Sequence, residues 1–162
     1  MNQIHFYALV PLLPLALVSV QLFLADLRSH RLPNRLTYPA LIATLVLDIV
    51  FGWALRAFEL WLTLGFAAVI LVFFLIAHLL SRGRFGMGDV KLILLISLAI
   101  GPLSADLPLI ALTLSFTVFA IYSIALLVFR KVKLATQLPL GPFLIVGAWV
   151  TVGLGLLASS LY

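Results

Sequence analysis

Six long apolar runs, separated by short polar segments, constrain this chain more than any other feature of its sequence. They cover about residues 6–25, 36–53, 60–80, 90–100, 107–129 and 138–161. Because a membrane-spanning helix needs about 20 mainly apolar residues, six of them use most of a 162-residue chain. We therefore expect an all-α polytopic membrane protein, a bundle of about six transmembrane helices that forms a single domain over residues 1–162.

The composition excludes several other classes of protein. With 65% hydrophobic and only 9% charged residues, the sequence leaves no room for a folded aqueous domain, such as a nucleotide-binding or nucleic-acid-binding module. The absence of cysteine excludes disulfides, zinc ribbons and thiol catalysis, and three scattered histidines do not make a metal site. We expect no cofactor, no metal and no nucleic-acid partner.

The basic residues orient the six expected spans. Nine of the ten fall on one side of the membrane, namely Arg28, Arg31, Arg35, Arg82, Arg84, Lys91, Arg130, Lys131 and Lys133, and only Arg56 falls on the other. Cationic loops stay cytoplasmic, so we expect a plasma-membrane protein with both termini outside and with anionic lipid headgroups beside the cytoplasmic cations. No Lys or Arg precedes the first run and no cleavage pattern follows it, which favours a retained helix over a signal peptide.

The fourth run is too short to cross the membrane as a regular helix. Its eleven residues span about 16 Å, roughly half of the hydrocarbon thickness. Either the turn at 101–106 or the preceding Gly-Met-Gly-Asp at 86–89 then lies within the membrane region. Irregular backbone at that depth is tolerated only within protein or beside water, which predicts a hydrated cleft around Asp89.

Two of the five acidic residues, Asp26 and Asp89, fall on the predicted cytoplasmic side. Two carboxyl groups in a partly dry site share a proton, so one can activate water while the other polarises a carbonyl, which permits peptide hydrolysis without a metal. Helix dipoles predict that Asp26, at a helix carboxyl end, holds the proton at rest. The structural alternatives are a helix N-cap for Asp89 and a solvated partner of arginine for Asp26.

Three segments resemble the type IV prepilin peptidase family, which belongs to the GxGD intramembrane aspartyl proteases. They are the Asp-basic-Leu-Pro-Asn segment at 26–37, the GxGDxK segment at 86–92 and the Pro-x-Gly-Pro-Phe segment at 139–144. The resemblance implies that Asp26 and Asp89 are the catalytic pair. It also implies that Gly86, Gly88 and Lys91 support the second aspartate and that Pro33 and Asn34 shape the first segment. For Lys91, the positive-inside rule is an equally good explanation.

The implied reaction removes the leader peptide from a prepilin or pseudopilin, such as a Flp-type pilin, at the cytoplasmic membrane boundary. Long family members also N-methylate the product and carry CxxC zinc ligands. This chain has no cysteine and a first cytoplasmic loop of about ten residues, so it resembles the short, peptidase-only members and is expected to lack N-methyltransferase activity.

The alternative is a small transporter or a membrane subunit of an assembly. Transporters place ionisable residues near the bilayer midplane, and Asp48 is the residue that fits this pattern. We expect Asp48 instead to pair with a neighbouring hydroxyl or with water. His78 is expected to be a hydrogen-bonded structural residue.

Overall fold

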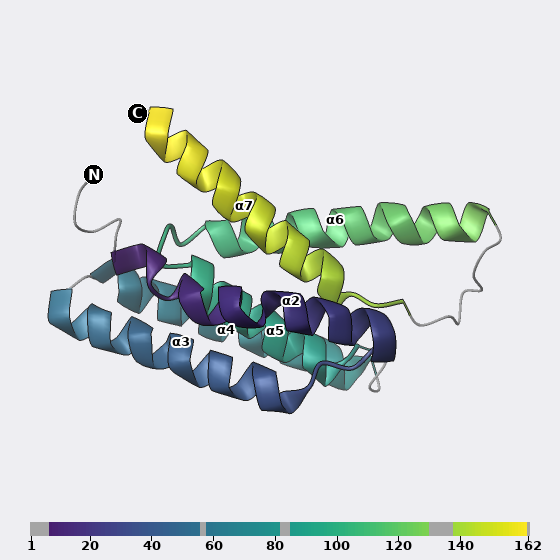
Figure 1. Cartoon of the computed structure of the whole chain (residues 1–162), viewed down its shortest axis with the longest axis horizontal. Helices are drawn as coiled ribbons and strands as arrows, with labels where there is room; N and C mark the ends of the chain where they lie inside the picture. Colours follow the sequence, from purple (N-terminus) through teal and green to yellow (C-terminus); the bar gives the residue numbers. More distant parts are fainter. Residues whose placement is uncertain (1–6, 56–57, 82–84, 130–137, 162) are drawn as a thin grey trace.

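The computed structural model describes residues 7–55, 58–81, 85–129 and 138–161 and is helical throughout these ranges apart from the turns (Figure 1). The helices are α2 (Leu12–Ser29), α3 (Asn34–Leu55), α4 (Phe58–Leu80), α5 (Met87–Ile100), α6 (Leu107–Val128) and α7 (Gly141–Leu161). All except α5 are long and apolar enough to cross a membrane. The predicted fold class, an all-α polytopic membrane protein, is confirmed.

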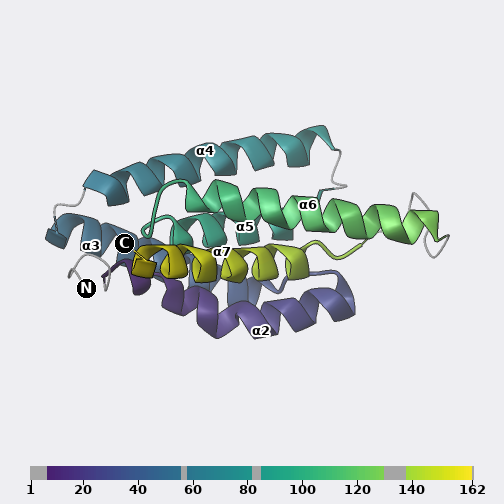
Figure 2. The same ribbon diagram turned by 90° about the horizontal axis from the view of Figure 1, so that it is seen from above.

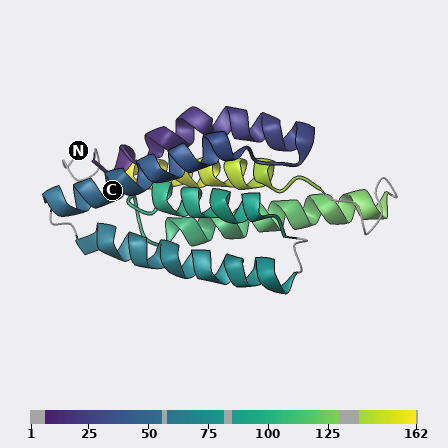
Figure 3. The same cartoon turned by 90° about the horizontal axis from the view of Figure 1, so that it is seen from below.

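Helix α5 forms the centre of the bundle. Its residues from Leu92 onward are almost all buried, because the helix is apolar on every face and contacts α2, α3, α4, α6 and α7. Viewed from below, α5 lies between α3 and α7 on one side and α4 and α6 on the other (Figures 2 and 3). With 14 residues, α5 is about 21 Å long. As expected from its short apolar run, it is shorter than the bilayer core is thick.

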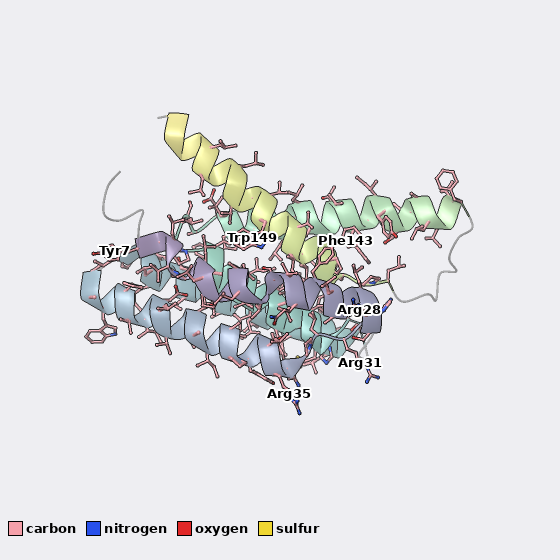
Figure 4. All side chains as sticks on the ribbon, in the orientation of Figure 1. Tyr7, Arg28, Arg31, Arg35, Phe143 and Trp149 are labelled. Atoms are coloured by element: carbon pink, nitrogen blue, oxygen red, sulfur yellow. The ribbon has the colours of Figure 1, made fainter. Side chains whose placement is uncertain are left out.

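Helices α6 and α7 pack mainly against each other and diverge from the remaining helices (Figure 1). Helix α2 joins this pair through α7, where the indole Nε1 of Trp149 donates a hydrogen bond to Ser19 Oγ at 3.0 Å. Figure 4 shows Trp149 and Phe143 on the stretch of α7 that crosses the bundle. Helix α6 contacts the bundle mainly through α7 and α5, and its Phe116 ring stacks on Phe74 of α4 with centroids 5.6 Å apart. It does not pack closely against α2, and a groove lies between these two helices.

The end of α2 and the starts of α3, α5 and α7 meet at one end of the bundle (Figure 1). Arg28, Arg31 and Arg35 are exposed at this same end (Figure 4). The other basic residues used to orient the chain, except Lys91, lie outside the described residues, namely Arg56, Arg82, Arg84, Arg130, Lys131 and Lys133. The nine-to-one distribution of cations across the membrane therefore stays a prediction.

Several helix boundaries differ from the expected ones by two to four residues, including the start of α7 at Gly141 instead of residue 138. The first span was expected to end near residue 25, but α2 continues to Ser29. It stops there because His30 adopts the left-handed conformation (φ 52°) and donates its backbone N–H to the carbonyl of Asp26. Asp26 thus lies within the last turn of the helix and not beyond it. Similarly, α5 begins at Met87, one residue after the extended Gly86.

Candidate active site

Asp26 is a buried carboxyl group held at the junction of α2 and α7. Its side chain is only 4% exposed. Asp26 Oδ2 accepts a hydrogen bond of 2.9 Å from the backbone N–H of Gly141, which lies 115 residues away and begins α7. A Cβ atom at position 141 would lie 2.8 Å from Asp26 Oδ2. The contact therefore requires glycine at this position.

Asp89 lies in the first turn of α5, three residues after the N-cap Gly86. From this position an acidic side chain reaches back toward the N-cap amide, and the Asp89 carboxyl group interacts with the backbone of Gly86. A Cβ atom at position 86 would lie 2.9 Å from Asp89 Oδ2. The expected structural alternative, with Asp89 as the N-cap residue itself, is wrong. Its half-buried side chain is partly open to solvent.

The fold brings the two aspartates together. Helix α2 packs against α5, and Leu32, in the loop after α2, packs on Gly88, the residue before Asp89. The two carboxyl groups are near enough for the charge of Asp26 to affect the ionisation of Asp89. Each carboxyl group also faces the amino terminus of a helix, α7 for Asp26 and α5 for Asp89. Helix dipoles therefore favour the charged form of both carboxyl groups, and they do not predict which of the two holds the proton at rest. Two interacting carboxyl groups, one buried and one half-buried, form a site that can share a proton.

The loop between α2 and α3 packs on the turn that carries Asp89. A Cβ atom at Gly88 would lie 3.2 Å from Leu32 Cβ, so the glycine allows this close approach. Pro33, which follows Leu32, directly precedes α3, and its carbonyl accepts hydrogen bonds from the amides of Leu36 and Thr37 at 3.0 and 3.1 Å. Gly88 and Pro33 thus lie where the sequence expects them, beside the turn and at the start of the second span.

Lys91 connects α5 to α3. Its Nζ donates a 2.9 Å hydrogen bond to Asn34 Oδ1 and lies 4.4 Å from the centre of the Tyr38 ring. Asn34 does not cap α3, because its side-chain oxygen binds Lys91 and Asn34 itself is the first residue of α3. Lys91 therefore links the helix that carries Asp89 to the helix that follows Asp26.

Comparison with known proteins decides the family. The model of the type IV leader peptidase family matches residues 13–129, which is more than half of the chain. The chain belongs to this family. It is also 28% identical over 134 residues to proteins named prepilin leader peptidase/N-methyltransferase from Aeromonas salmonicida, including strain A449. This alignment covers 82% of the chain and 45% of each relative, so the chain spans less than half the length of these relatives. No solved structure matches the chain.

Gly141 is a site residue of this leader peptidase family member that was not expected from the sequence. The signal was present, because Gly141 is the glycine of the Pro-x-Gly-Pro-Phe segment. The role of this glycine becomes visible once α7 is placed against α2 and its amide meets Asp26.

Phe85, the residue that directly precedes the Gly-Met-Gly-Asp turn, is bound by residues at the end of α4. His78 Nδ1 lies 2.6 Å from the carbonyl oxygen of Phe85, and the backbone N–H of Phe85 donates to Ser81 Oγ at 3.0 Å. The Phe85 ring also stacks on Phe74, with centroids 5.7 Å apart. His78 is thus a hydrogen-bonded structural residue, as expected, and it anchors the turn that carries Asp89.

Asp48 lies outside this site. It is fully buried in α3, about 21 Å along the helix from Asn34, and neither carboxyl oxygen has a hydrogen-bond partner among the described residues. No neighbouring hydroxyl among the described residues is its partner, so that part of the expectation is wrong, and pairing with water stays a prediction. Because Asp48 is remote from Asp26 and Asp89, it takes no part in the arrangement described above.

Replacing Lys91 with Met is expected to lower kcat/KM for peptide cleavage about three- to tenfold. A hydrogen bond to a charged group contributes about 1.5–3 kcal/mol when it is shielded from water, and Lys91 is only half-buried. Asn34→Ala should have a similar effect, and the double variant should be no worse than either single variant, because both remove the same link. Additive losses in this double-mutant cycle would show that Lys91 and Asn34 act separately.

Proposed function

We propose that this chain is a membrane aspartyl endopeptidase that removes the leader peptide from type IV prepilin or pseudopilin precursors, such as Flp-type pilins. Asp26 and Asp89 are the catalytic pair. The observation that carries the proposal is the packing of Leu32, in the loop after α2, on Gly88 beside Asp89, together with the contact of α2 with α5. Both carboxyl groups therefore lie at the same end of the bundle, although they come from different helices. Membership of the type IV leader peptidase family supports it, as does the name of the Aeromonas relatives.

The chemistry needs one ionised and one protonated carboxyl group. The carboxylate takes a proton from water, and the resulting oxygen attacks the carbonyl carbon of the scissile bond while the protonated partner donates to the carbonyl oxygen. Collapse of the tetrahedral intermediate breaks the C–N bond, and the leaving amine takes up a proton from the pair. Water is thereby divided between a new carboxyl group and a new amine, and no metal or covalent intermediate is required.

The site faces the cytoplasm in this proposal, and the membrane is the bacterial or archaeal plasma membrane. Arg28, Arg31 and Arg35 support this orientation, because they are exposed at the same end as Asp26 and cationic loops stay cytoplasmic. These arginines would also bind anionic lipid headgroups. The leader would then be cut where the substrate leaves the membrane on the cytoplasmic side.

The finer proposal is cleavage without N-methylation. The Aeromonas relatives are named as both peptidase and N-methyltransferase and are more than twice as long as the matched part of this chain. Here only residues 30–33 separate α2 from α3, so no domain is inserted between these helices. The sequence contains no cysteine that could provide the zinc ligands of the long family members.

The test uses the purified chain in lipid bilayers, with candidate prepilins and with or without S-adenosylmethionine. We expect a product that lacks its leader and begins at the apolar helix, with the same intact mass whether or not the methyl donor is present. Intact-protein mass spectrometry measures both results. A methylated product would contradict the peptidase-only proposal, and prepilins that stay uncut across a panel including Flp-type substrates would contradict the proposed reaction.

A further inference from the structure

An apolar groove of about 560 Å³ lies on the open face between α2, α6 and α7. We define it by Phe23 and Leu27 of α2, Val118 and Tyr122 of α6, and Phe143 and Val146 of α7. Several of these side chains are about half exposed, among them Leu27 (46%), Val118 (45%) and Val146 (51%). Since α2 and α6 do not pack against each other, the groove opens sideways from the bundle.

The groove is preformed and almost entirely apolar. The Phe143 ring contacts Phe119 and Tyr122, with centroids 5.4 and 5.2 Å apart, and so fixes the wall made by α6 and α7. Ser115 also lines the groove, but its hydroxyl donates to the carbonyl of Ala111 at 2.7 Å. A groove of this kind suits an apolar ligand and offers few polar groups to a charged one.

One end of the groove lies within about one helical turn of Asp26, although neither Asp26 nor Asp89 lines it. On α2, Phe23 and Leu27 flank Asp26, which lies between them in sequence. On α7, Pro142 and Phe143 directly follow Gly141, whose amide binds the Asp26 carboxyl group. From Pro142 the lining of α7 continues to Val150, about 12 Å or just over two helical turns away.

We infer that the groove binds the apolar helix of the substrate, from the scissile bond toward the far side of the membrane. This inference rests on the proposed function, because a leader cut just before an apolar helix requires that helix to stay in the bilayer while its first peptide bond reaches Asp26. The groove is the apolar surface that extends from Asp26 in that direction. The alternative occupant of the groove is the acyl chain of a membrane lipid.

The test compares Val118→Trp with a matched control on the same helix, Ile121→Trp. Both residues are exposed aliphatic side chains of α6, 45% and 64% respectively, but only Val118 lines the groove. An indole at position 118 takes up space in the groove, and Val118 belongs to α6, which carries neither aspartate. We expect Val118→Trp to raise KM for a full-length prepilin at least about tenfold with little change in kcat, which is the pattern of lost substrate binding. Ile121→Trp should match wild type.

A binding measurement accompanies the kinetics. A photoreactive phenylalanine analogue is placed at position 118 or 121 in the Asp26→Asn variant, which keeps the substrate intact. We expect cross-links to the prepilin helix from position 118 and not from position 121. Equal KM values for the two Trp variants, or cross-links from position 118 to lipid alone, would overturn the groove while leaving cleavage by the wild type, and with it the proposed function, intact. Absence of wild-type cleavage would instead contradict the proposed function.

Discussion

Replacing either Asp26 or Asp89 with Asn is expected to lower leader cleavage by at least about 10³-fold. Asn has nearly the same shape as Asp, but it cannot take a proton from water as the carboxylate does or donate one as the carboxylic acid does. Because each group has a role only in the presence of the other, the double variant should be no slower than the slower single variant. The measurement is kcat/KM on a prepilin with the protein in lipid bilayers.

The matched control for this experiment is Asp48→Asn. It makes the same chemical change at another buried acid of the bundle, one that lies apart from the pair. We expect Asp48→Asn to cleave at the wild-type rate, and we expect all variants to retain helical content and monodispersity. If Asp26→Asn or Asp89→Asn cleaved normally, the catalytic pair would be wrongly assigned.

Replacing Gly141 with Ala is expected to reduce kcat about 100-fold or more, although this residue carries no functional side chain. The new Cβ atom would lie 2.8 Å from Asp26 Oδ2 and 3.3 Å from Asp26 Cβ. Rotation of the carboxyl group alone cannot relieve both contacts, so Asp26 or the start of α7 must move. Because Asp26 is buried, such a shift moves it relative to Asp89, and displacements of about 1 Å can cost about 10²-fold in rate.

Gly153→Ala provides the control on the same helix. A Cβ atom at Gly153 would meet nothing within 4 Å, so this variant should retain full activity. It should also be slightly more stable, because Ala in a helix interior is favoured over Gly by roughly 0.5–1 kcal/mol. Wild-type kcat for Gly141→Ala would show that the contact between Gly141 and Asp26 is not needed for cleavage. Equal losses in both variants would point to a general effect on α7.

The sequence alone determined the class of fold, the short fourth helix and the two acids of the candidate site. These features are local: the length of an apolar run limits what a segment can do in a membrane, and a glycine-flanked acid before such a run marks a turn at a helix start. The six apolar runs correspond to α2–α7 in the structure. The family resemblance, carried by the same segments, agrees with the match to the type IV leader peptidase family.

Only the tertiary structure decided how these segments support one another. The hydrogen bond from Gly141 to Asp26, the link from Lys91 to Asn34 and the anchoring of Phe85 by His78 depend on which helices are neighbours. Hydrophobic runs carry no information about neighbours, because every apolar helix face satisfies the lipid equally well. For the same reason, the isolation of Asp48 and the groove between α2 and α6 became visible only after the helices were packed around α5.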